Sequence, residues 1–396
     1  PPTDVDVDVD AVTSLHNAAE AGIPQILHPA AVKNHFSVKD LLVKKTNKKK
    51  ISSPRRQQLL LSGNATFKLP HYSPFGADHH RPTFRRPKLI ELVKDHKNNI
   101  IIQDVDFLLD FAIIGFAKAG TSTMMEWLGL HNQISCFSGE TPHLSKGMVG
   151  AFVKRLYNGL DPDPLKLHGY KNPTDIQNLR AIRLLREYFP DSKIFIGIRH
   201  PILWFQSFYN HRIQNTGKMP DPKKLAEHCS RDSQGVCGPR AHYHLALSRL
   251  GKTNYTLERE AYSQKEWEHL LRDDPVWSPN PVFLYDTQQL ADKDPVRKTA
   301  FRSDIEAFLG LTTPLDDNPH YSPGKTLNAT EQAERDAKKL DICLEKHGKL
   351  RKTLLEASQH AAHWIRTYFI HAPDVYISNP DHFQDIMDSY MVDPCG

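Results

Sequence analysis

Residues 111–123 read Phe111-Ala112-Ile113-Ile114-Gly115-Phe116-Ala117-Lys118-Ala119-Gly120-Thr121-Ser122-Thr123, and the architecture of the chain is predicted from them. The first four are wholly apolar and end at a glycine, which is typical of a buried strand in the centre of a parallel sheet. Beyond the turn, apolar residues recur at helical spacing, and Thr121 or Ser122 is suited to cap that helix. The segment therefore predicts a strand, a tight turn and a helix.

Two later apolar runs repeat this pattern. The run at 193–199 follows a helical stretch around residues 182–188 that Pro190 closes, and the run at 282–285 precedes a helix that stops at Gly310. Strands that alternate with helices predict an α/β fold, in which helices flank both faces of a central, mostly parallel sheet. A last amphipathic stretch, from Leu350 to about Ile370, is assigned to the core.

The composition excludes several classes of protein. The chain has 396 residues, and its 51 basic and 46 acidic residues give a net charge of +5. A charge this small over so long a chain argues against a nucleic-acid partner. With 39% hydrophobic residues the chain can bury a core, but its apolar runs are too short to span a membrane. We also find no cluster of His, Cys and carboxylate residues at metal-ligand spacing, so no metal is expected.

We expect an N-terminal extension over residues 1–104 and a folded domain over residues 105–396. Asp and Val alternate over residues 4–10, which favours a mobile terminus, and basic residues concentrate between residues 44 and 88. We interpret this basic segment as a solvated stem, the alternative being a collar for an anionic lipid or polymer. The chain begins with Pro1, which leaves room for a signal or membrane anchor upstream.

Cysteines and glycosylation sequons bear on the compartment. The five cysteines are Cys136, Cys229, Cys237, Cys343 and Cys395. Cys229 with Cys237 is one candidate disulfide and Cys343 with Cys395 is a second, whereas the alternative is five reduced thiols. Asn-x-Thr sequons begin at Asn64, Asn254 and Asn328. Together these features favour the lumen of a secretory-pathway compartment, with the cytoplasm as the alternative.

The turn after the first strand has the chemistry of an anion site. Its small residues let the backbone wrap closely around an anion, and the N–H groups at the start of the helix point toward it. Three hydroxyls, at Thr121, Ser122 and Thr123, add donors. The usual nucleotide loop requires a lysine after its second glycine, whereas Lys118 precedes Gly120 by two residues. The segment therefore predicts an anion-binding turn other than the Walker loop.

At these residues the chain resembles the sulfotransferases that use 3′-phosphoadenosine 5′-phosphosulfate (PAPS), and its motif spacing is most similar to that of the Golgi carbohydrate branch. The resemblance covers about residues 108–370 and implies a P-loop-like fold. It implies that the 5′-phosphosulfate is bound by Lys118, Ala119, Gly120, Thr121, Ser122 and Thr123.

A second motif of the family has an Arg at the end of a later strand, a Pro two residues on and a Ser eight residues after the Arg. Here Arg199, Pro201 and Ser207 match it. The carboxyl edge of such a sheet is where ligands bind. The resemblance implies that Arg199 and Ser207 hold the 3′-phosphate.

The base that takes the acceptor proton is expected 22 residues after Lys118, at Glu140, because the Golgi branch has a glutamate at similar spacing. His143 is the rival base. Lys171, within Gly169-Tyr170-Lys171-Asn172-Pro173, looks like a second family lysine that flanks the transferring group.

The remaining cofactor contact in the family is a basic, glycine-containing loop before the last helix. Two segments compete for this role, residues 321–326 and a segment with Lys346, Gly348 and Lys349, and we favour the second because it directly precedes the final helix.

The resemblance implies transfer of a sulfuryl group from PAPS to a hydroxyl or amine, with a carbohydrate favoured as acceptor and a small molecule as the alternative. A P-loop kinase or NTPase is disfavoured by the position of Lys118 and by the lack of a convincing strand-end aspartate for magnesium. A catalytically silent carbohydrate-binding protein that keeps the fold is the other alternative.

Overall fold

The computed structural model describes residues 86–95, 100–216, 219–225, 242–253, 278–318 and 329–396. All of them belong to one compact unit, Phe67–Gly396. The expectations for residues 1–85, for the pair Cys229–Cys237, for the asparagines of the three sequons and for the segment 321–326 lie outside the described residues.

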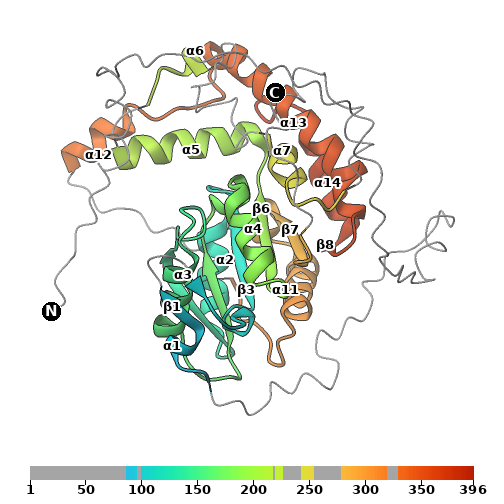
Figure 1. The fold of residues 1–396 in the computed structure, drawn as a ribbon. Coiled ribbons are helices and arrows are strands. Elements are labelled where there is room, and N and C mark those ends of the chain that lie inside the picture. The colour runs from blue at the N-terminus through green and yellow to red at the C-terminus, as the bar shows by residue number, and fades with distance from the viewer. Residues whose placement is uncertain (1–85, 96–99, 217–218, 226–241, 254–277, 319–328) are drawn as a thin grey trace, which may run out of the picture. The chain divides into compact units, whose positions relative to one another are not determined.

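A six-stranded sheet forms the centre of the domain (Figure 1). Its order is β4-β5-β3-β6-β7-β8, and each neighbouring pair is parallel. The strands are β3 (Phe111–Gly115), β4 (Ile134–Glu140), β5 (Leu167–Lys171), β6 (Lys193–Ile198), β7 (Val282–Asp286) and β8 (Val375–Ile377). A short antiparallel pair precedes them, β1 (Val93–Asp95) with β2 (Ile100–Ile101). The α/β fold predicted from the sequence is confirmed.

Helices connect the strands, as parallel pairing requires. The α-helices are α1 (Leu89–Leu92), α2 (Thr121–Gly129), α3 (Val149–Gly159), α4 (Leu179–Tyr188), α5 (Pro201–Thr216), α6 (Pro222–Leu225), α7 (Tyr243–Ser248), α10 (Thr287–Leu290), α11 (Pro295–Leu309), α12 (Ala329–Asp336), α13 (Gly348–Thr367) and α14 (Pro380–Ser389). Single 3₁₀ turns lie at η3 (Asp106–Leu108), η4 (Asp175–Gln177), η5 (Glu345–His347) and η6 (Phe369–His371). None of these described helices combines the length and the apolar character that crossing a bilayer requires.

The two faces of the sheet carry separate cores because side chains alternate along each strand. Phe111 and Ile113 of β3 pack with α2 and α11 on one face. Ala112 and Ile114 of the same strand belong to the core on the other face, with α3, α4, α5 and α13. The central strands are therefore buried on both faces, which explains their continuous apolar runs.

Residues before the expected domain start also join this core. Leu92 of α1 and Val93 of β1 are buried with the helices of the main domain. The Arg86 side chain donates a hydrogen bond to the carbonyl oxygen of Tyr157 (3.1 Å) and lies over that residue's ring. The packed domain thus includes residues 86–95 and 100–104.

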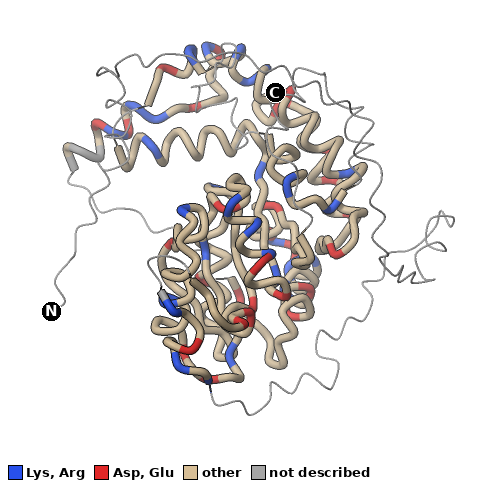
Figure 2. Tube along the Cα trace, in the orientation of Figure 1, with Lys and Arg blue, Asp and Glu red and all other residues tan. Residues whose placement is uncertain are grey.

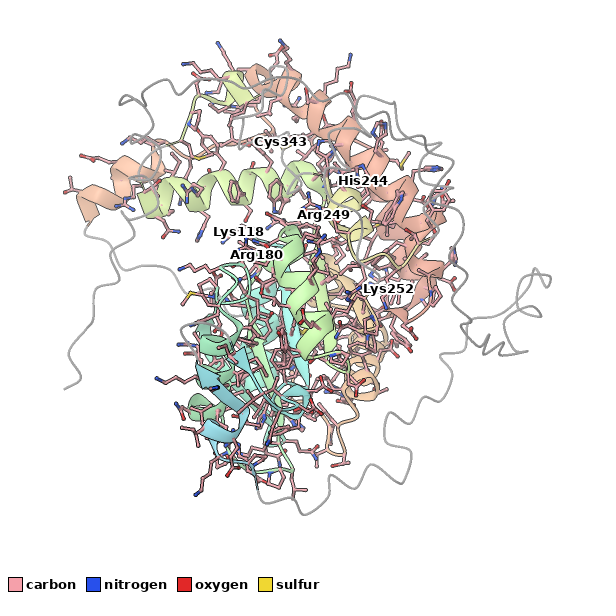
Figure 3. All side chains as sticks on the ribbon, viewed as in Figure 1. Lys118, Arg180, His244, Arg249, Lys252 and Cys343 are labelled. Atoms are coloured by element: carbon pink, nitrogen blue, oxygen red, sulfur yellow. A yellow bond between two sulfur atoms is a disulfide. The ribbon has the colours of Figure 1, made fainter. Side chains whose placement is uncertain are left out.

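A disulfide joins Cys343, just before α13, to Cys395 near the end of the chain (Figure 3). The second candidate pair from the sequence is thereby confirmed, and Cys136 is a free thiol. Arg351 of α13 adds an ion pair to Asp393, at 2.9 Å between Nε and Oδ2. The C-terminal segment is therefore fastened to the start of α13.

Basic and acidic residues are interspersed along the described chain (Figure 2). This distribution agrees with the small net charge of +5. Candidate site residues among the charged side chains are therefore identified by their position at the edge of the sheet, because the described chain does not separate its charges by sign.

Candidate active site

Charged side chains follow four neighbouring strands at the carboxyl edge of the sheet. Glu140 ends β4 and Lys171 ends β5. Lys118, labelled in Figure 3, lies in the loop after β3. Arg199 directly follows β6. Because these strands are neighbours in the order β4-β5-β3-β6, residues that are up to 81 positions apart (199 − 118) meet at one edge. Ligands of parallel α/β sheets bind at this edge.

The loop after β3 adopts a left-handed backbone at two positions. Lys118 has φ 68° and Gly120, the N-cap of α2, has φ 75°. A left-handed residue other than glycine is uncommon and indicates that the surrounding structure enforces the conformation. The loop therefore presents Lys118 and the first N–H groups of α2, which have no partner inside the helix, at the same edge.

Contacts with β6 and α5 hold this loop in place. The Phe116 N–H donates to the carbonyl of Gly197 (2.8 Å), and the Trp204 indole N–H donates to the carbonyl of Ala117 (2.8 Å). A Cβ at Gly197 would stand 2.3 Å from the carbonyl oxygen of Ala119, so only a glycine lets the loop lie this close to β6.

Lys171 links the loop to the expected base. Its side chain is only 7% exposed, and its Nζ donates to the hydroxyl of Ser122 (2.8 Å). The same Nζ lies 3.8 Å from Oε1 of Glu140, whose side chain is 57% exposed. Burial lowers the pKa of Lys171, and the nearby Glu140 carboxylate opposes that shift. The strand register explains the pairing, because Glu140 lies opposite Lys171.

The positive charges of Lys118, Lys171 and Arg199 act on one another at this edge. Burial is the main cause that lowers the pKa of Lys118, followed by the positive charge of Arg199. Lys171 lowers the pKa of Lys118 further, whereas Glu140 raises it. A polyanion bound here would relieve this repulsion.

A cavity of about 770 Å³ adjoins the loop. Its walls are Lys118, Gly120, Thr123, Arg199, His200, Leu203, Thr287, Gln288, Leu290, Ala291, Asn318, Ser389, Val392 and Pro394. Two cations and several hydroxyl and amide groups face apolar side chains across it. This mixture of donors and apolar surface suits a phosphorylated nucleotide, whose base is flat and whose phosphates are charged.

Besides the basic segment at the start of α13, the predicted site residues that do not line this cavity are Ala119, Thr121, Ser122, Glu140, His143, Lys171 and Ser207. Ser207 is half-buried on α5, four residues after the lining residue Leu203 and so on the same helical face. His143 follows β4, where its ring faces Phe152 with centroids 6.4 Å apart. Its Nδ1 is buried and has no hydrogen-bond partner among the described residues. Burial and the charges of Arg155 and Lys146 lower the pKa of His143.

The basic segment with Lys346, Gly348 and Lys349 lies at the start of α13 and outside the lining of the cavity. The expectation that it directly precedes the final helix is wrong, because α14 follows α13. Lys346 and Lys349 are exposed, and Gly348 is the first residue of α13. The preceding residues 340–342 are bound to α5, where the Ile342 N–H donates to Oε1 of Gln206 (2.8 Å). The segment is thus tied to the helix that carries Ser207.

Two walls of the cavity were not predicted from the sequence. One is α10, whose residues Thr287, Gln288 and Leu290 line it, and the other is the C-terminal segment 389–394. The pairing of Cys343 with Cys395 was the one sequence signal that the chain's end folds back. Asp286, which ends β7, was also missed as a strand-end aspartate, although hydrogen bonds within the protein engage both its oxygens.

No family model matches the chain, and no curated protein matches it. Among solved structures, the chain is similar to a sulfotransferase from Alicyclobacillus acidocaldarius, with 18% sequence identity and a TM-score of 0.34. The match covers 65% of this chain and 95% of that chain. The function of this chain is therefore inferred from its own site residues.

Proposed function

We propose that the protein is a sulfotransferase that takes a sulfuryl group from PAPS and passes it to a hydroxyl or amine of an acceptor. The observation that supports this most strongly is the arrangement of Lys118, Lys171 and Arg199 around one edge of the sheet, with Glu140 beside Lys171. Sulfuryl transfer needs cations that stabilise the negative charge on the sulfuryl group and on the leaving phosphate. It also needs one base that accepts the proton of the acceptor.

The lining of the cavity supports PAPS as the donor. Arg199 has the planar fork that binds a phosphate through two hydrogen bonds, and Lys118 offers a point charge at the loop. Leu203, Leu290 and Val392 supply apolar surface for a base. Ser207, one turn along α5 from Leu203, extends the proposed 3′-phosphate site.

When bound, PAPS supplies an activated sulfuryl group and leaves as adenosine 3′,5′-bisphosphate. We assign the acceptor proton to Glu140, because its side chain is exposed and an acceptor can reach it. As the acceptor oxygen or nitrogen bonds to sulfur, its proton passes to the Glu140 carboxylate. The bond between sulfur and the phosphate oxygen breaks, and Lys118 and Lys171 stabilise the electron pair that remains on that oxygen.

Glu140 is preferred over His143 as the base on contacts. Glu140 pairs with Lys171, which itself contacts Ser122 at the start of α2. The His143 ring instead faces the buried ring of Phe152. For the acceptor we favour a carbohydrate, and for the compartment a secretory lumen, which the Cys343–Cys395 disulfide supports.

Calorimetric titration with adenosine 3′,5′-bisphosphate, without magnesium, tests the donor assignment. We expect binding by the wild type, and binding about ten- to hundredfold weaker by Lys118→Ala, because a charge-assisted contact is lost. Lys298→Ala is the matched control, since Lys298 of α11 pairs with Asp317 in the segment after that helix, and its loss should leave the affinity unchanged.

Transfer itself is tested with labelled PAPS and pooled acceptors. A preference for magnesium-bound ATP over the bisphosphate contradicts the proposal and favours a kinase or NTPase. Nucleotide binding without any labelled product favours the catalytically silent relative.

A further inference from the structure

Asp286 is a fully buried carboxylate at the carboxyl end of β7, next to the cavity but not in its lining. It lies opposite Ile198 in the pairing of β6 with β7, so the residue after its partner is Arg199. An aspartate is seldom buried completely unless other groups compensate its charge. The groups that contact Asp286 therefore indicate its role in the protein.

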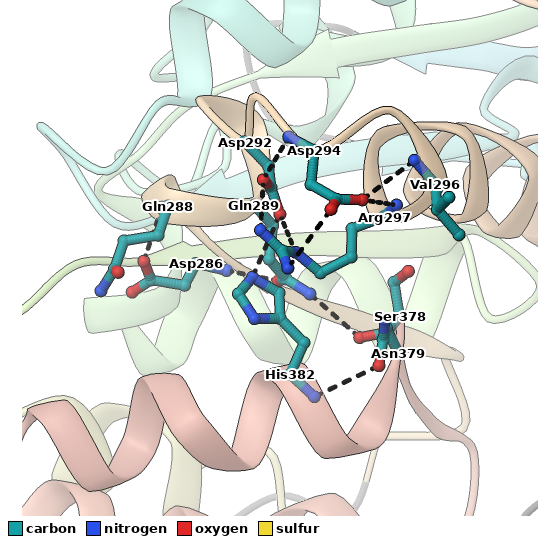
Figure 4. Close-up of polar contacts among 10 residues, drawn as sticks. All are labelled: Asp286, Gln288, Gln289, Asp292, Asp294, Val296, Arg297, Ser378, Asn379 and His382. Atoms are coloured by element: carbon teal, nitrogen blue, oxygen red, sulfur yellow. Dashed lines mark hydrogen bonds and ion pairs between the residues drawn. The ribbon is translucent and has the colours of Figure 1, made fainter.

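One oxygen of Asp286 holds α10, as Figure 4 shows. Oδ1 accepts a hydrogen bond from the backbone N–H of Gln288 (2.7 Å). In return, Oε1 of Gln289 accepts from the Asp286 N–H (2.9 Å), which completes a capping box. These bonds fix the turn whose residues Thr287 and Gln288 line the cavity.

The other oxygen holds the C-terminal wall. Oδ2 accepts a hydrogen bond from the Tyr390 hydroxyl, which is also fully buried. Tyr390 lies between Ser389 and Val392, and both of these line the cavity. A single carboxylate thus connects two walls that are about 100 residues apart in the sequence.

The third partner is electrostatic. The positive charge of Arg199 acts on Asp286 and also on the two nearby hydroxyls of Tyr243 and Tyr390. Asp286 therefore provides a counter-charge to Arg199, which is the arginine among the described residues that line the cavity.

We propose that Asp286 is a positioning residue of the donor site, which fixes α10 and the segment 389–394 as two walls and holds Arg199 between them. The inference rests on the proposed function. It implies that Asp286 affects donor binding without touching the donor.

The pKa of Asp286 indicates how its charge affects the stability of the fold. Burial raises the pKa of Asp286 to about 6, although Tyr390, Gln288 and Arg199 oppose that shift. Because the folded pKa is above the ordinary value of 3.8, this carboxyl stabilises the fold most at low pH, and that contribution is lost as the pH rises through about 6. At neutral pH the charge of Asp286 is therefore a cost to the folded state.

Asp292, on the loop after α10, is the matched control (Figure 4). It is a buried carboxylate whose charge is paired with Arg297, at 2.6 and 2.9 Å, and which also faces His382 at 3.3 Å. The Arg297 hydrogen bond lowers the pKa of Asp292 to about 2, so its charge stabilises the fold above pH 4 and that contribution is lost toward pH 2. Within the described residues, the side chain of Asp292 forms no hydrogen bond or ion pair with residues 389–394, the C-terminal wall of the cavity.

The test is calorimetric titration of adenosine 3′,5′-bisphosphate at pH 7.5 into wild type, Asp286→Asn, Tyr390→Phe and Asp292→Asn, with melting temperatures measured in parallel. We expect Asp286→Asn to weaken binding about ten- to hundredfold, because Asn has a single acceptor oxygen and no charge. Tyr390→Phe should weaken binding less. The double variant Asp286→Asn/Tyr390→Phe should lose less binding free energy than the sum of the two single losses, because both substitutions remove the same hydrogen bond. Asp292→Asn should lower the melting temperature yet keep the affinity.

Each outcome decides the inference. If Asp286→Asn binds as tightly as the wild type, or more tightly because a negative charge has left the anion site, the inference is wrong. If Asp286→Asn does not fold, Tyr390→Phe decides in its place, and unchanged affinity there overturns it. If the wild type binds no bisphosphate at all, it is the proposed function that fails. In the transfer assay, Asp286→Asn should raise the KM for the donor and leave that for the acceptor unchanged.

Discussion

Glu140 and Lys171 differ in solvent exposure, and this difference fits their different roles in the proposed reaction. Lys171 is buried and held by Ser122, so it can present a fixed charge to the transferring group. Glu140 is the exposed member of the pair, and an acceptor can approach it from solvent. A buried cation beside an accessible carboxylate is the arrangement that a base-assisted transfer requires.

Replacing Glu140 by Gln should lower kcat about 10²- to 10⁴-fold, because the acceptor proton then has no base. The affinity for adenosine 3′,5′-bisphosphate should stay within about twofold of the wild-type value, since Glu140 does not line the cavity. Single-turnover assays and calorimetry measure the two effects separately. His143→Gln is the comparison variant, and a larger loss of kcat there would make His143 the base.

Asp175, at the turn after β5, predicts how stability depends on pH. It is buried, it accepts hydrogen bonds from the Tyr170 hydroxyl (2.9 Å) and the Asn172 amide (2.5 Å), and burial raises its pKa to about 7. The folded state holds this proton more tightly than the unfolded state, so the contribution to stability is full below about pH 4 and is lost as the pH rises through 7.

We therefore expect the free energy of unfolding of the wild type to fall relative to that of Asp175→Asn between about pH 4 and 7. The relative slope should not exceed about 1.4 kcal/mol per pH unit, the value for one proton. Urea unfolding at a series of pH values measures it. Parallel curves for the two proteins would show that Asp175 titrates in the same range in both states.

Among the secondary-structure elements, the strands that were predicted from sequence are the ones buried on both faces. β3, β6 and β7 are almost entirely apolar, so they could be identified from composition alone. β5 contains His168 and Lys171, which are buried because His168 contacts the Asp161 carbonyl (2.7 Å) and Lys171 contacts Ser122. Those partners come from other segments, and a local pattern cannot show them.

The same distinction applies to the site. Lys118 and Arg199 could be placed from sequence because each lies within three residues of the end of an apolar strand. The cavity walls at Gln288 and Val392 could not, because neither position carries a motif. Their role depends on how β7 and the C-terminal segment come to lie beside the loop after β3, which is a property of the sheet order.

The disulfide between Cys343 and Cys395 predicts a coupled loss of stability and binding. It closes a sequence separation of 52 residues, so the chain-entropy estimate for its removal is ~4 kcal/mol. In the double variant Cys343→Ser/Cys395→Ser, the wall at Pro394 loses its fastening, and we expect weaker binding of adenosine 3′,5′-bisphosphate.

Denaturant unfolding and calorimetry of the double variant test this prediction. Cys136→Ser is the control, because that thiol is free and distant in sequence from both walls. Unchanged affinity in the double variant would mean that Arg351 and Asp393 hold the wall without the disulfide.

In the molecule as a whole, the residues that line the cavity range from the loop after β3, the first strand of the central sheet in the sequence, to the C-terminal segment. Lys118 lies near the start of its sheet, and Pro394 lies close to the last residue of the chain. A ligand that contacts both should stabilise the domain as one unit, by about 2.7 kcal/mol at a concentration of 100 times its Kd.

Hydrogen exchange should show this directly. We expect adenosine 3′,5′-bisphosphate to slow amide exchange both at residues 116–124 and at residues 389–394, since a bound ligand suppresses local opening of each wall. Adenosine 5′-phosphate, which lacks the 3′-phosphate, should protect residues 199–203 less. Protection confined to the loop after β3 would place the ligand outside the cavity.

Five ionisable residues stand at consecutive strand ends along the sheet edge, in the order Glu140, Lys171, Lys118, Arg199 and Asp286. Three cations are thus bracketed by a carboxylate on either side, and the row sums to +1 (3 − 2). Fields of opposite sign cancel with distance, and salt screens the remainder beyond about 8 Å. A dissolved anion therefore feels little attraction until it reaches the edge itself. Donor capture should consequently proceed by unassisted diffusion, with an association rate that changes little with ionic strength, while the release rate carries the discrimination among anions.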